Sequence, residues 1–112
     1  MIVPDTGFLE IQKTKLSEIL NLSESMLESA KRSEWPELTQ TEEHRRKLIE
    51  DFFSREVTPE TALMVEEVIK KIMVLDKEII ELGEAMKKKM SLELKNISTG
   101  RVAAKAYSEN SR

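Results

Sequence analysis

The chain has 112 residues, the length of one domain, and 39% of them are hydrophobic, 35% charged and 4% aromatic. It contains no cysteine and one histidine, His44, which excludes disulfide scaffolds, thiolate metal sites and cysteine nucleophiles. No apolar run approaches the ~18 residues of a membrane span, and no leader pattern is present, so we expect a cytoplasmic protein. Few aromatic residues and glycines, with abundant Glu, Lys, Leu and Met, predict an all-α fold and argue against an enzyme. We expect no cofactor.

The net charge of −3 is unevenly distributed along the chain. Residues 1–86 carry 11 Lys/Arg against 19 Asp/Glu, whereas residues 87–112 carry seven Lys/Arg against two Glu. An acidic body repels nucleic acid, so we expect no nucleic-acid partner. The basic C-terminal part has three possible interpretations: it contacts an acidic partner, it folds onto the acidic body, or it stays solvated.

The first predicted helix covers residues 8–32, after an N-terminal arm over residues 1–7 with Asp5 or Thr6 as the N-cap. Apolar residues recur there at steps of three and four, which is typical of one buried helix face. They are Leu9, Ile11, Leu16, Ile19, Leu20, Leu22, Met26, Leu27 and Ala30.

A second helix is predicted over residues 35–54, because Pro36 interrupts the first helix and is tolerated in a first helical turn. The connection is so short that the two helices have to be antiparallel neighbours. Trp35 at this turn is expected to close the end of the bundle, and a binding anchor is the alternative.

The third helix is predicted over residues 59–98, with Thr58 as N-cap and Pro59 in the first turn. Gly100 is expected to end it, leaving a weakly helical tail over 101–112. Two apolar stripes predict contact with two neighbours, so the chain is expected to fold as one antiparallel three-helix domain over 1–112. The first stripe is Val65, Val68, Ile72, Leu75, Ile79, Leu82 and Met86, and the second is Ala62, Ile69, Met73 and Ile80.

The third helix is much longer than its neighbours. At 1.5 Å per residue the three helices measure roughly 37, 28 and 57 Å, so the third is expected to pass the first turn over residues 79–97. This part still carries apolar residues, which need a cover: the tail, a second copy of the chain or a foreign partner. We expect partner binding here through Ile79, Leu82, Met86, Met90 and Leu94.

Two charged clusters have less specific interpretations. Residues 42–44, Glu-Glu-His, form half of a metal site on paper, but a solvated face with the pairs Glu42–Arg46 and Glu43–Lys47 is the simpler interpretation. The run Lys87–Lys89 is expected either at the rim of the binding face or simply in solvent.

Two segments resemble a known family. Residues 34–38 (EWPEL) and 42–53 (EEHRRKLIEDFF) resemble the Trp-x-x-Leu…Glu-x-x-Arg…Phe-Phe stretch of the flagellar FliT family. Residues 99–107 (TGRVAAKAY) resemble that family's C-terminal Gly-Arg…Ala-Tyr segment. The length and the layout of three helices with a tail agree as well.

The resemblance implies a cytoplasmic type III export chaperone that binds the filament-cap protein before secretion. It also implies contacts with the export gate and the export ATPase complex, with Tyr107 matching the tyrosine that docks the loaded chaperone on the gate. In this family the tail is thought to cover the binding face when cargo is absent. Some members of the family also act on the flagellar master regulator. Two alternatives therefore remain open: a module that sequesters a transcription factor, and a structural coiled-coil subunit that forms a homo-oligomer.

Overall fold

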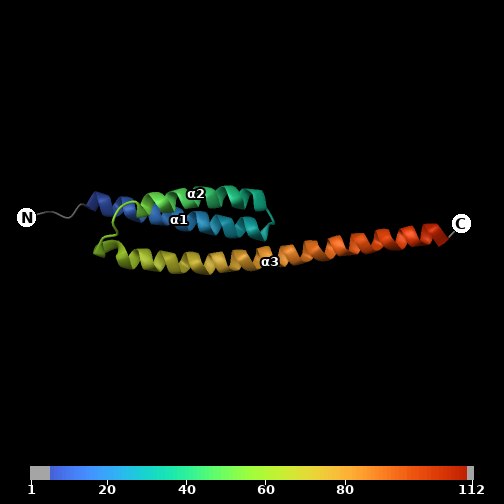
Figure 1. Cartoon of the computed structure of the whole chain (residues 1–112). Helices are drawn as coiled ribbons and strands as arrows, with labels where there is room; N and C mark the ends of the chain where they lie inside the picture. Colours follow the sequence, from blue (N-terminus) through green and yellow to red (C-terminus); the bar gives the residue numbers. More distant parts are fainter. Residues whose placement is uncertain (1–5, 111–112) are drawn as a thin grey trace, which may run out of the picture. The chain divides into compact units, whose positions relative to one another are not determined.

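The computed structural model describes the backbone of residues 6–110, without the side chains of Thr6, 102–104 and 106–110. Within this range the chain forms three helices and no strand: α1 (Thr6–Lys31), α2 (Trp35–Phe53) and α3 (Pro59–Asn110) (Figure 1). The prediction of an all-α fold with a long third helix is therefore confirmed. The predicted N-cap Asp5 and most of the predicted arm lie outside the described residues.

The chain divides into two compact units, which we call the bundle unit (Met1–Ile80) and the C-terminal unit (Glu81–Arg112). The bundle unit contains α1, α2 and the first part of α3. The C-terminal unit contains the rest of α3 as far as Asn110.

A tight turn joins α1 to α2. The Glu34 N–H donates to the Ser29 carbonyl at 2.8 Å and the Ser33 N–H to the Ala30 carbonyl at 3.1 Å, which is the Schellman pattern of a helix end. Ser33 occupies the left-handed position of this motif, with φ 57°. Since the connection has three residues, α1 and α2 lie side by side and antiparallel (Figure 1), as predicted.

Helix α3 begins where the sequence predicts. The Thr58 carbonyl accepts hydrogen bonds from the N–H groups of Thr61, at 3.1 Å, and Ala62, at 3.0 Å. The Thr58 hydroxyl lies 3.1 Å from the Thr61 hydroxyl, and Thr61 is fully buried. Pro59, which lacks an N–H group, therefore stands where no donor is needed.

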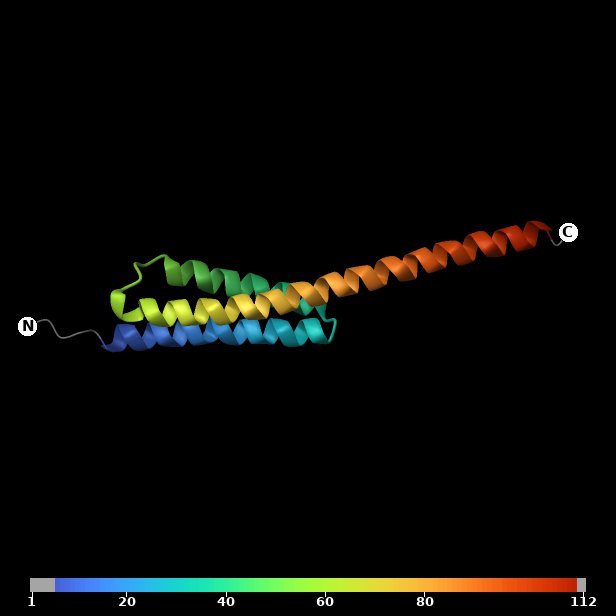
Figure 2. The same cartoon turned by 90° about the horizontal axis from the view of Figure 1, so that it is seen from below.

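All three helices contribute to one hydrophobic core in the bundle unit, and Figure 2 shows them alongside one another. Leu16 and Ile19 come from α1, Phe52 from α2 and Val65 from α3, and each is at most 7% exposed. Six partly buried side chains pack around them: Leu48, Ile49, Val57, Met64, Val68 and Ile72. The predicted three-helix bundle is thus confirmed.

The second predicted stripe of α3 is largely exposed. Ile69, Met73 and Ile80 are 41%, 65% and 59% exposed. The expected contact of α3 with two neighbours is present, since Val65 shares one core with Leu16 of α1 and Phe52 of α2, but the first stripe makes it. The second stripe therefore borders the solvent.

Helix α3 does not end near Gly100. It continues without interruption to Asn110, so the predicted end at residue 98 and the separate tail over 101–112 were wrong within the described residues. A glycine inside a helix costs only about 1 kcal/mol, and the residues that follow, Ala103, Ala104 and Lys105, are strong helix formers. The other helix ends lie close to the predicted ones: α1 begins at Thr6 instead of residue 8, and α2 ends at Phe53 instead of residue 54.

Candidate partner-binding surface

One face of the C-terminal unit carries a row of large apolar side chains, which we call the seam. Its members are Leu82, Met86, Met90, Leu94 and Ile97. With about 100° of rotation per residue, their spacing of 4-4-4-3 keeps them within an arc of about 120°. The α-helix therefore gathers them on one side.

The outer part of the seam is exposed. Met90, Leu94 and Ile97 are 54%, 65% and 53% exposed, whereas Leu82 and Met86 are half-buried. Ile79, which the sequence placed in the same surface, is only 8% exposed in the bundle unit. We therefore exclude Ile79 from the accessible surface and keep the other four predicted seam residues as candidates.

The structure also exposes an apolar residue that the sequence analysis did not single out. Leu92 is 53% exposed but lies about 160° around the helix from Leu94, on the opposite face. It therefore does not belong to the seam.

The cations of the C-terminal unit have no ion-pair partner among the described residues. The six that the structure describes are exposed: Lys87, Lys88, Lys89, Lys95, Arg101 and Lys105. By contrast, the ion pairs of the described chain all lie in the bundle unit, for example Lys70–Glu66 at 3.1 Å. The seam is thus accompanied by positive charge that the described protein leaves uncompensated.

Tyr107, the remaining predicted site residue, lies within α3 by its backbone. Its side chain is outside the described part of the structure. Its role stays a prediction.

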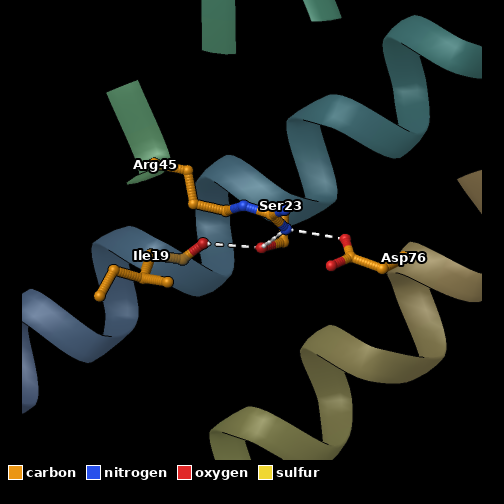
Figure 3. Close-up of polar contacts among 4 residues, drawn as sticks. All are labelled: Ile19, Ser23, Arg45 and Asp76. Atoms are coloured by element: carbon orange, nitrogen blue, oxygen red, sulfur yellow. Dashed lines mark hydrogen bonds and ion pairs between the residues drawn. The ribbon is translucent and has the colours of Figure 1, made fainter. Parts of the chain in front are cut away.

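A polar cluster joins all three helices of the bundle unit (Figure 3). Arg45 Nη1 on α2 donates to Asp76 Oδ1 on α3 at 2.7 Å and to Ser23 Oγ on α1 at 3.0 Å. The Ser23 hydroxyl, which is fully buried, donates in turn to the Ile19 carbonyl at 3.0 Å. The sequence does not reveal that Arg45 has a partner 31 residues away.

A second ion pair connects α1 with α2. Lys15 Nζ donates to Asp51 Oδ2 at 2.7 Å, and this hydrogen bond, together with the charge of Lys15, lowers the pKa of Asp51 below its ordinary value of 3.8. Arg55 acts in the same direction through its charge. In these two contacts the earlier residue of α1, Lys15, meets the later residue of α2, Asp51, and the later residue of α1, Ser23, meets the earlier residue of α2, Arg45. This order is the one that antiparallel helices require.

The Glu-Glu-His cluster of residues 42–44 lies on α2. The pairs Arg46–Glu42, at 3.5 Å, and Lys47–Glu43, at 3.8 Å, are present, which confirms a charged helix face around His44.

Among residues 6–110 no three His, Cys, Asp or Glu side chains are grouped to hold a metal. No helix of the described chain is both long and apolar enough to span a membrane.

The bundle unit also has an apolar groove of about 210 Å³. Side chains of all three helices line it, and each of them is apolar: Leu16, Ile19, Ile49, Phe53, Val68, Ile69, Ile72 and Met73. The sequence did not predict this groove. From the spacing alone, Ile69 and Met73 were expected to be buried against a neighbouring helix and not to line an open groove. Ile69 and Met73 are the two residues of the second stripe that line it.

These observations define the class of protein first: a small all-α bundle protein with a long third helix that presents an apolar seam. Comparison with known families then gives the particular family, because the model of the family described as flagellar protein FliT matches residues 13–109. The chain belongs to this flagellar family, whose general role is that of an export chaperone with protein partners. No curated protein and no solved structure matched the chain.

Proposed function

We propose that the protein is a cytoplasmic export chaperone that binds an apolar segment of an export substrate, shields it, and delivers it to the export gate. The substrate is the filament-cap protein, as the family resemblance implies. The observation that carries the proposal is the seam, where Met90, Leu94 and Ile97 are each more than half exposed. A helix with such a face binds a partner segment through apolar contacts at helical spacing.

The seam supplies enough apolar surface for a reversible complex. Fully burying a Leu, Ile or Met side chain contributes about 1.5–3 kcal/mol. Ordering a disordered cargo segment opposes this with about 2–5 kcal/mol or more. The net affinity is therefore moderate, which suits a chaperone that has to release its cargo. Tyr107 has a separate role in the proposal, as the residue that contacts the export gate.

The test is calorimetric titration of the purified chain with the C-terminal segment of the filament-cap protein. The double variant Met90→Ser/Leu94→Ser should weaken binding about 100-fold, since two buried apolar contacts are lost. Leu92→Ser is the matched control: its side chain is as exposed but lies on the opposite face, so its affinity should stay within twofold of wild type. Equal affinity of the double variant and the wild type would contradict the proposal.

The same samples separate the two alternatives. A transcription-factor module would bind a DNA-binding regulator through the seam and leave the cap segment unbound. A structural subunit would form a tight homo-oligomer in sedimentation experiments that does not change when the cap segment is added. Tyr107→Ala should leave cap binding intact and weaken only the contact with the export gate.

A further inference from the structure

Two positive charges of the C-terminal unit lie at the edges of the seam. At about 100° per residue, Lys89 lies about 20° outside Leu82, at one edge of the seam, and Lys87 about 20° outside Leu94, at the other edge. Both side chains are exposed, and neither has an ion pair in the described chain. The seam is therefore bordered by a cation on each side.

Two further lysines provide an internal comparison. Lys88 and Lys95 are also exposed, but they lie about 160–180° from the centre of the seam, on the opposite face. Arg101 and Lys105 return to the seam side one to three turns further along α3. Four of the six described cations thus lie on the seam side of α3, and two lie opposite it.

We propose that the segment bound on the seam is an acidic amphipathic helix whose carboxylates lie beside Lys87 and Lys89 at the two edges. This inference rests on the proposed function and adds the chemistry of the partner. An exposed ammonium group beside an apolar contact attracts carboxylates, favours partners with acids at the matching positions, and disfavours partners with lysines there.

The charges elsewhere on the chain favour a protein partner over the other polyanions. Residues 1–80 carry 11 Lys/Arg against 17 Asp/Glu, so the bundle unit repels a nucleic-acid duplex. Glu93 lies within the arc of the seam, between Leu82 and Met86 in angle, and burying its carboxylate against an anionic lipid surface is unfavourable. A helical protein segment can place a polar side chain opposite Glu93.

The experiment uses the full chain and three synthetic helical peptides of about 20 residues, a length typical of one partner helix. All three carry leucines at the spacing of the seam, and they differ only at the edge positions, which are Glu, Gln or Lys. Fluorescence anisotropy should show the Glu peptide binding roughly tenfold more tightly than the Gln peptide at about 0.15 M salt, and the Lys peptide more weakly than both. The difference should shrink at about 1 M salt.

The matched variants remove the same number of charges from the two faces of one helix. Lys87→Gln/Lys89→Gln should abolish the preference for the Glu peptide, whereas Lys88→Gln/Lys95→Gln should retain most of it. Equal affinities for the Glu and Gln peptides, or an equal loss in both variants, would overturn the proposal. So would tighter binding of a DNA duplex or of phosphatidylserine vesicles at the same salt concentration.

The outcome also separates this inference from the proposed function. If Met90→Ser/Leu94→Ser weakens all three peptides while the Glu and Gln peptides bind equally, only the charge preference fails. If the seam variant changes no affinity, the seam is not a binding surface, and both proposals fail.

Discussion

The two units use the same helix and similar apolar spacing, yet their side chains have different surroundings. In the bundle unit Val65 and Ile79 on α3 are 7% and 8% exposed. In the C-terminal unit Met90 and Leu94 are 54% and 65% exposed. The comparison shows that periodicity identifies an amphipathic face but does not identify what covers it.

Charge pairing follows the same division. The described ion pairs lie between residues of the bundle unit, and the best buried of them, Arg45–Asp76, connects two helices. The described cations of the C-terminal unit are exposed and form no ion pair within the described part of the chain. Charges therefore stabilise the fold in one unit and, in our proposal, select the partner in the other.

The largest effect should come from the core of the bundle unit. Phe52 is 3% exposed and packs edge-to-face on Phe53, with ring centroids 5.0 Å apart. Phe52→Ala should lower the free energy of unfolding by about 3–5 kcal/mol, because it removes a buried ring and leaves a cavity. Urea denaturation followed by circular dichroism measures this loss.

Leu92→Ala is the comparison in the C-terminal unit. Its side chain is already exposed, so the free energy of unfolding should change by less than about 0.5 kcal/mol. Similar losses in the two variants would mean that the C-terminal unit contributes to the stability of the fold as much as the core of the bundle unit does.

The second effect concerns the polar cluster of the bundle unit. Asp76→Asn should destabilise the bundle by about 1–2 kcal/mol, because the charged bond to Arg45 is lost while Asp76 remains partly solvated. Arg46→Ala breaks an exposed pair with Glu42 on one helix and should cost only about 0.3–0.5 kcal/mol.

A double-mutant cycle over Asp76→Asn and Arg45→Met isolates the coupling between the two side chains. A coupling energy near zero would show that the Arg45–Asp76 contact does not hold α3 against the other two helices.

The sequence predicted the elements that depend on local signals. Thr58 and Pro59 marked the start of α3, and the spacing around Leu16 and Ile19 identified core residues. It did not predict the Arg45–Asp76 contact or the exposure of Ile69, since both depend on how the helices are oriented about their axes. The seam residues were predicted from spacing, whereas their accessibility, and the burial of Ile79, required the structure.

The smallest effect concerns two positions where the backbone favours a different residue from the one present. Glycine suits the turn conformation of Ser33, and a helix-forming residue suits position 100. Ser33 adopts φ 57° in the turn of the bundle unit, a conformation that glycine adopts without strain. Gly100 lies inside α3, and a Cβ added there would meet nothing within 4 Å. Ser33→Gly should raise the free energy of unfolding of the bundle by about 0.5–1 kcal/mol, since relief of strain exceeds the added entropy of the unfolded chain.

Gly100→Ala should favour the helix by up to about 1 kcal/mol locally and increase the helical circular dichroism signal. Because Gly100 belongs to the C-terminal unit, that change should leave the urea midpoint of the bundle where it was. A shift of the midpoint by Gly100→Ala, measured beside Ser33→Gly, would show that the two units unfold together.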